Sequence, residues 1–145
     1  MMLVAHRAAA VNTVTVTTLL DSNTPGDGMC SLREAVANIN TQSEGTMGDC
    51  ATGLSTNNIA FGVTGTITLS KGVISLGGAE ASVSIEGSDK VALDGGGTSQ
   101  IFDVNTLVYL NDLTITNGFG GNGGAIVVVG ALRATHCSFV ASCAS

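Results

Sequence analysis

The sequence predicts an all-β fold, a right-handed parallel β-helix (a solenoid) whose first coil is covered by a short α-helix. Three observations support this prediction. Short segments in which apolar and polar residues alternate recur along the chain. Glycine-containing turns close most of these segments. One segment near residue 35 has helical periodicity instead.

The composition suits strands that have one buried face and one wet face. The chain has 145 residues, enough for one domain, and 11% of them are charged, against about 25% in typical proteins. Its polarity comes mainly from Thr, Ser, Asn and Gly. Threonine and serine can face water from a strand, and threonine keeps a high strand propensity there.

Charge and aromatic content exclude two classes of partner. The formal net charge is −6, aromatic residues make up 3% of the chain, and tryptophan is absent. The few aromatic rings argue against a stacking platform for nucleic acid or sugar. The acidic net charge argues further against nucleic acid and against anionic membrane surfaces. No apolar run approaches the roughly 18–20 residues that cross a bilayer, so no membrane span is expected.

The alternating segments share a period of two. In chain order they are residues 14–17, 66–69, 83–85, 91–93, 102–104, 113–115, 126–128, 132–134 and 137–139. Segments 84–87, 92–95 and 114–118 repeat the order polar, apolar, polar and then glycine, which suggests about 20 residues per unit. A single coil cannot bury its apolar row alone, so such repeats predict stacked coils. A β-sandwich is the alternative, but the chain lacks the aromatic core residues that sandwiches commonly use.

Residues 31–39 break this rhythm and predict the helix. Their apolar positions follow the helical spacing i, i+3, i+4 and i+7; they are Leu32, Ala35, Val36 and Ile39. Ser31 and Glu34 form a capping box at the helix start. The first coil of a β-helix would expose strand edges and core side chains to water. We therefore expect this helix to cover that coil, with Arg33 anchoring it.

The two ends of the chain carry separate expectations. Residues 1–10 are interpreted as a signal-peptide remnant or as a disordered or arbitrary start. Residues 11–145 are expected to form a single β-helix domain. A new coil begins just before residues 143–145, which favours a C-terminally truncated domain; the alternative is an open coil covered by another chain.

Four cysteines indicate an oxidising compartment. They are Cys30, Cys50, Cys137 and Cys143. Because none of them has C-x-x-C spacing, a structural zinc site is not expected. Two disulfides in an exported protein explain the four residues better, and the spacing leaves their pairing open.

The hexapeptide CSLREA at residues 30–35 resembles the domain family named for it, found at the start of bacterial secreted β-helix proteins. The resemblance runs from about residue 11 onward; its further segments are 58–61, 65–69, 85–87, 93–97, 102–104, 113–118, 123–126 and 137–139. It implies a secreted or cell-surface right-handed β-helix, similar to adhesins and polymorphic outer-membrane proteins. It also implies a Cys30–Cys50 disulfide, which would close a loop of about 20 residues and stabilise the fold by roughly 3 kcal/mol.

Acidic residues suggest an enzymatic alternative, a pectate-lyase-like polysaccharide lyase or a glycoside hydrolase. Asp94, Asp103 and Asp112 are the candidate carboxylates, and Arg133 or Lys90 would serve as the base, with calcium as the cofactor. These aspartates are nine residues apart, which is not one coil, so they need not share a face. The competing interpretation is that they are solvated turn residues.

A small ester hydrolase is the second enzymatic alternative. His136, with Ser138 beside it and Asp112 one strand away, is the candidate base. The chain has no G-x-S-x-G elbow, and a surface histidine explains the same residue. A metal site at His136, Cys137 and Cys143 competes with a Cys137–Cys143 disulfide or a buried Cys137. The glycine-rich residues 118–124 lack the aspartate of calcium repeats, so no metal is expected.

The leading hypothesis is a non-catalytic extracellular scaffold, an adhesin-like module that is secreted or displayed on the cell surface. Its expected partners are an extracellular polysaccharide or another cell-surface ligand. Self-association through the open C-terminal coil is also expected. No cofactor is expected, with calcium reserved for the lyase alternative.

Overall fold

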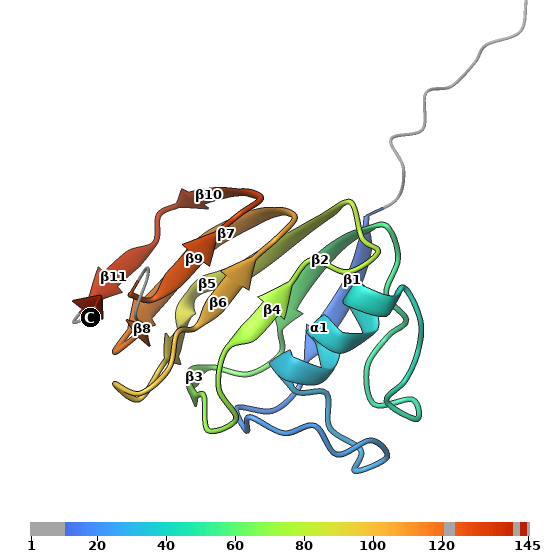
Figure 1. Cartoon of the computed structure of the whole chain (residues 1–145). Helices are drawn as coiled ribbons and strands as arrows, with labels where there is room; N and C mark the ends of the chain where they lie inside the picture. The colour runs from blue at the N-terminus through green and yellow to red at the C-terminus, as the bar shows by residue number, and fades with distance from the viewer. Residues whose placement is uncertain (1–10, 121–123, 141–142, 145) are drawn as a thin grey trace, which may run out of the picture.

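The computed structural model describes residues 11–120, 124–140 and the backbone of 143–144. It is a parallel β-solenoid of about three turns with one short helix at its N-terminal end (Figure 1). The predicted β-helix is therefore confirmed. The interpretation of residues 1–10 as a signal-peptide remnant or disordered start lies outside the described residues.

The described strands pair in parallel and form three sheets. The elements are β1 (Asn12–Val16), α1 (Leu32–Thr41), β2 (Thr56–Phe61), β3 (Gly65–Thr68), β4 (Ile74–Leu76), β5 (Ser82–Asp94), β6 (Phe102–Val104), β7 (Leu107–Thr116), β8 (Phe119–Gly120), β9 (Ile126–Val128), β10 (Ala131–Thr135), β11 (Ser138–Val140) and β12 (Cys143–Ala144). The main sheet has the order β1-β2-β5-β7-β10, with β3 beside β5 and β11 beside β7. The second sheet has the order β4-β6-β9, and β8 pairs with β12.

The coils are longer than the sequence repeat predicted. Val83 lies opposite Val108, and Val108 lies opposite Leu132, so successive coils are 25 and 24 residues apart. The expectation of about 20 residues was wrong because each coil makes two stretches of the main sheet, one strand of the second sheet and the turns between them.

Rows of apolar side chains stack through the coils and form the core. In the main sheet one row is Val14, Ile59, Ile85 and Leu110, and a second is Ile67, Leu93 and Ile115. All seven are at most 1% exposed. A fully buried side chain of this size contributes about 1.5–3 kcal/mol, and because its row partners lie in the neighbouring coils, no coil is stable alone.

The predicted cap helix is confirmed, and it ends two residues later than expected, at Thr41 rather than at residue 39. Ser31 is its N-cap: the Glu34 N–H donates to Ser31 Oγ at 3.1 Å, and the Ser31 N–H donates to Glu34 Oε2 at 3.1 Å. The helix ends at Thr41, where Gln42 adopts a left-handed conformation with φ 47°. It lies against β1 and β4 at the end of the solenoid (Figure 1). Its four core-facing apolar residues are buried: Leu32, Ala35, Val36 and Ile39.

Arg33 anchors this helix, as the sequence predicted. Its guanidinium donates to both Asp21 oxygens, from Nε at 2.7 Å and from Nη2 at 3.0 Å, and Nη2 also donates to the Gly72 carbonyl at 2.6 Å. The backbone N–H groups of Ser70 and Lys71 donate to Asp21 as well, each at 2.9 Å. One ion pair therefore joins the cap helix, the first coil and the 70–73 turn.

The Cys30–Cys50 disulfide is present, with Cα atoms 4.9 Å apart across a separation of 20 residues. The second disulfide, expected at Cys137 and Cys143, is not formed, because Cys137 is a free thiol. Its sulfur lies 3.3 Å from the Leu110 carbonyl oxygen and packs against the core instead. The side chain of Cys143 lies outside the described residues. A helix with the length and hydropathy of a membrane span is not found in the described part of the chain.

Replacing Cys30 and Cys50 together by alanine should lower the free energy of unfolding by about 3 kcal/mol, since the disulfide closes a loop of about 20 residues. Urea denaturation of the variant and of the unmodified chain measures the difference. Cys137→Ala is the matched control and should change stability much less. An unchanged unfolding midpoint in the double variant would show that the cap is held without the disulfide.

The Asp21–Arg33 pair should make the stability of the cap pH-dependent. Burial raises the pKa of Asp21, but the hydrogen bonds and charge of Arg33 and the N–H groups of Lys71 and Ser70 outweigh it, so the pKa lies below its usual value. A lowered folded-state pKa stabilises the fold above the unfolded value of about 3.9. This stabilisation is lost as the pH falls through the folded value.

Asp21→Asn should therefore destabilise the fold at neutral pH by roughly 1–3 kcal/mol, because Arg33 loses its charged partner. Thermal unfolding followed from neutral to acidic pH should show the two proteins converging below about pH 4. A difference that stays constant into acid would contradict this account of the ion pair.

Candidate ligand-binding groove

The outer face of the main sheet carries a groove at the corner where successive coils differ in the number of residues between their paired strands. Four residues separate Ala60 from Gly65 in one coil, and four separate Glu86 from Val91 in the next. In the coil after that, the partner strand β7 has Asp112 alone between Asn111 and Leu113. The chain at residues 87–90 therefore bulges outward beside a flatter coil. Gly87 is required there, since a Cβ would lie 2.4 Å from the Asp112 carbonyl oxygen.

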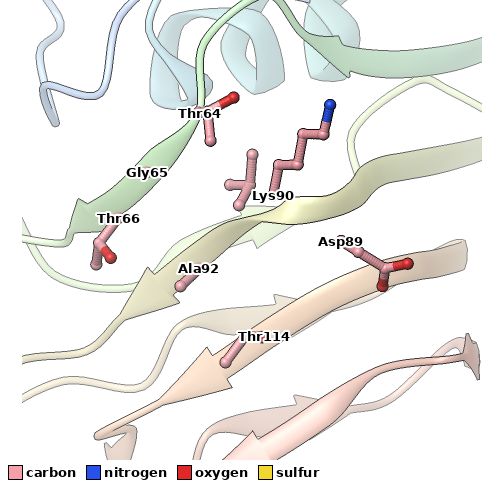
Figure 2. Close-up of a pocket in the computed structure, with 8 residues that line it drawn as sticks. Thr64, Gly65, Thr66, Asp89, Lys90, Ala92 and Thr114 are labelled. Atoms are coloured by element: carbon pink, nitrogen blue, oxygen red, sulfur yellow. The ribbon is translucent and has the colours of Figure 1, made fainter.

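The groove has a volume of about 400 Å³. Its floor is a row of small outward-facing side chains from three coils, Thr66, Ala92 and Thr114, which lie opposite one another in register. Lys90 and Asp89 rise from the bulge above this floor. Figure 2 shows Lys90 extending to the side where Thr64 lies, with Asp89 on the other side of the strand.

These side chains offer both donors and acceptors to a ligand. Each threonine hydroxyl donates and accepts, the Lys90 ammonium donates, and the Asp89 carboxylate accepts. Both charged residues are exposed, and neither forms an ion pair with another described residue. Because Ala92 lies between Thr66 and Thr114, the two floor hydroxyls are two strand separations apart, roughly 9.6 Å. Hydroxyl groups of a ligand at that spacing can pair with both.

An acidic corner borders the groove. His136 Nδ1 lies 3.4 Å from Asp112 Oδ1, and the two residues sit at the same corner of successive coils, both with φ 52°. Burial raises the pKa of Glu86, and the carboxylates of Asp112 and Asp89 raise it further, against the opposing hydrogen bond from the Ser88 N–H. This corner can therefore hold a proton more readily than an isolated carboxylate would.

The three candidate lyase aspartates lie in different places. Asp94 ends β5 and accepts a hydrogen bond from the Gly96 N–H at 2.7 Å, Asp103 lies on the second sheet, and Asp112 occupies the corner. The structure therefore does not gather them on one face. Of the two candidate bases, Lys90 lines the groove, whereas Arg133 lies on β10 opposite Tyr109.

The candidate esterase residues are brought together only in part. Asp112 does pair with His136, but the His136 side chain is 80% exposed. Ser138 lies opposite Thr114 on β11 and donates no hydrogen bond to His136. The described residues contain no group of three His, Cys, Asp or Glu side chains placed to hold a metal ion.

Sequence reasoning missed Thr64, Thr66, Asp89 and Thr114 as groove residues and considered Lys90 only as a catalytic base. The sequence did contain one signal for the groove, namely the number of residues between positions that recur from coil to coil. Three more residues separate Glu86 from Val91 than separate Asn111 from Leu113. Extra residues at a coil corner must project outward, because the inward space is filled by the stacked rows.

Comparison of the chain with protein-family models, curated proteins and solved structures finds no match. Function is therefore inferred from the groove, the cap and the exposed faces of the solenoid.

Proposed function

We propose that this chain is a non-catalytic, adhesin-like extracellular module that binds a saccharide on the outer face of its main sheet. The observation that carries the proposal is the groove, in which the hydroxyls of Thr66 and Thr114, on the two coils that flank Ala92, lie beside Lys90 and Asp89. Saccharides present hydroxyl groups at regular intervals, and a row of donors and acceptors matches them.

A solenoid suits such binding because its outer face is held rigid by its core. Outward residues of neighbouring coils are fixed in register by the buried rows beneath them. A preorganised surface loses little side-chain and backbone freedom when a ligand binds. Affinity can then accumulate over several weak contacts along the row.

The family and location are part of the same proposal. The CSLREA segment occupies the disulfide and the start of the cap helix, which gives its Cys, Ser, Arg and Glu clear structural roles. These roles support membership of the bacterial secreted β-helix family that the hexapeptide resembles. A disulfide in a chain with this fold is compatible with secretion or surface display.

One structural observation supports each of the two enzymatic alternatives. The Asp112–His136 pair favours an ester hydrolase, and Lys90 in the groove favours a lyase acting on an acidic polysaccharide. Both lack a second catalytic group in position: Ser138 donates no hydrogen bond to His136, and the three aspartates do not converge. Activity assays in the presence and absence of calcium distinguish both from a binding module.

Self-association belongs to the proposal as well. Val128 and Phe139 continue the buried rows into the last described coil, yet they are 44% and 51% exposed. Since α1 covers the opposite end of the solenoid, one copy cannot stack its open end on the closed end of another. We therefore propose a closed dimer in which two copies meet through their last coils, an isologous contact.

Thr114→Arg should abolish saccharide binding, because the long side chain fills the groove floor without touching the core. Binding is measured on a glycan array and then by calorimetry with the best ligand. Thr13→Arg, an exposed change on β1 outside the groove, is the matched control and should retain affinity. Equal binding by both variants would exclude the groove. Calcium-dependent cleavage of the bound polymer would show that the protein is a lyase and not a binding module. Ester turnover that is lost in His136→Ala would show that it is an ester hydrolase.

Phe139→Lys should convert a dimer into a monomer, because it places a charge in the centre of the proposed contact. Sedimentation equilibrium over a range of protein concentrations measures the association. Leu20→Lys, at an apolar residue that is 59% exposed near the other end, should leave the dimer intact. A chain that stays monomeric at every concentration would contradict the dimer without affecting the groove.

A further inference from the structure

The outward side chains in the second stretch of the main sheet repeat on every second coil. Residues 66–68 and 114–116 both read Thr-Ile-Thr and lie two coils apart in register, with Ala-Leu-Asp at 92–94 between them. The central residue of each segment is buried in the core: Ile67, Leu93 and Ile115. The outer face therefore alternates between a pair of threonines and an alanine with an aspartate.

The next described coil continues this alternation. Ser138 lies opposite Thr114, so each threonine of the row is followed by a smaller side chain; the row is Thr66, Ala92, Thr114 and Ser138. Neighbouring strands are about 4.8 Å apart, so the pattern recurs at roughly 9.6 Å. The groove is lined by the first three members of the row, and a ligand can therefore cross these coils without interruption.

The polar groups of this face are open to a ligand. The threonine hydroxyls form no hydrogen bond with another described residue; they belong to Thr66, Thr68, Thr114 and Thr116. Asp94 accepts the Gly96 N–H at 2.7 Å with Oδ1, whereas its Oδ2 has no partner among the described residues. Lys90 and Asp89 offset each other in charge, and the chain carries a net charge of −6. A neutral ligand rich in hydroxyl groups suits this surface better than an acidic polymer.

One class of saccharide has the same alternation. Hexoses joined by 1,4 bonds through equatorial oxygens form an extended polymer in which each unit is turned over relative to the one before it. Each unit advances by slightly more than the strand separation of about 4.8 Å. Along one edge of such a polymer, a pair of ring hydroxyls therefore alternates with a hydroxymethyl group. The groove is lined by no aromatic side chain on which a sugar ring could stack, so this hydroxyl-bearing edge would meet the sheet.

We propose that the saccharide of the groove is a neutral, extended 1,4-linked hexose polymer that lies along the solenoid axis with one sugar unit on each coil. This inference rests on the saccharide-binding function proposed above and names its substrate class. The two threonines of a strand are roughly 6.6 Å apart and flank a pair of ring hydroxyls between them. Ala92 leaves room for the hydroxymethyl group, which donates to Asp94 Oδ2. Thr68 and Thr116 thus extend the binding site beyond the groove.

The test is calorimetry of the full chain with hexasaccharides that differ in one property. Cellohexaose should bind at least tenfold more tightly than maltohexaose, which has the same sugar units in a curved chain with axial 1,4 bonds. Xylohexaose, which is extended but lacks hydroxymethyl groups, should bind with intermediate affinity. Hexagalacturonate, which is acidic, should bind more weakly than cellohexaose.

Two variants connect this selectivity to the row. Replacing Thr68 and Thr116 together by valine removes two hydroxyls at constant shape and should weaken cellohexaose binding by about tenfold, the effect of losing two hydrogen bonds. The matched control replaces Thr13 and Thr15, exposed residues of β1 outside the row, by valine and should retain affinity. Ala92→Val fills the space for the hydroxymethyl group and should weaken binding of cellohexaose but not of xylohexaose. A misfolded variant would lose both ligands.

The outcomes separate this inference from the proposed function. Equal affinity for cellohexaose and maltohexaose, with binding still abolished by Thr114→Arg, would overturn the extended polymer and leave the groove as a saccharide site. Unchanged affinity in the variant of Thr68 and Thr116, or tighter binding of hexagalacturonate than of cellohexaose, would overturn it as well. If no saccharide binds to the folded protein, the inference and the proposed function are both wrong.

Discussion

The stacking of apolar rows from coil to coil is the interaction on which the rest of this structure depends. Ile59 is buried because Val14 lies on one side of it and Ile85 on the other. Among the described strands β1 is the edge of the main sheet, and α1 packs on that coil in the place that a neighbouring coil would take. The cap is therefore part of the core in energetic terms, although its sequence pattern is that of a separate element.

The cap in turn is secured by contacts that do not depend on one another. The disulfide holds the loops at either side of α1, the capping box fixes its first turn, and the Arg33–Asp21 pair joins it to the first coil and the 70–73 turn. The Asp49 carboxylate adds a further link, accepting the N–H groups of Gly26, Asp27 and Gly28. Such redundancy allows a ten-residue helix, too short to be stable alone, to close one end of a solenoid.

Local patterns predicted the elements of this fold well, and their failures have physical reasons. The period-two segments and the capping box depend on neighbours in sequence, so they can be predicted from the sequence. The partners of Arg33 lie 12 and 39 positions away, so its anchoring role could be expected but its partners could not. The coil length and the groove depend on which residues face each other across coils. Thr66 and Thr114 are 48 positions apart in the sequence, and register alone brings both to one floor. The same limit applies to Cys137, because its inward packing against Leu110 cannot be inferred from cysteine spacing.

The bulge at residues 87–90 lies at a corner where the length of the chain can change without disturbing the core. Pairing resumes at Val91 and Leu113 with every buried side chain still opposite its partner, although one strand carries three residues more than the other. Insertions and deletions at this corner therefore leave the core register intact. Homologous or engineered chains can diversify the loop in length as well as in sequence, much as antibody loops vary on a constant framework, and each coil supplies another such position along the same edge.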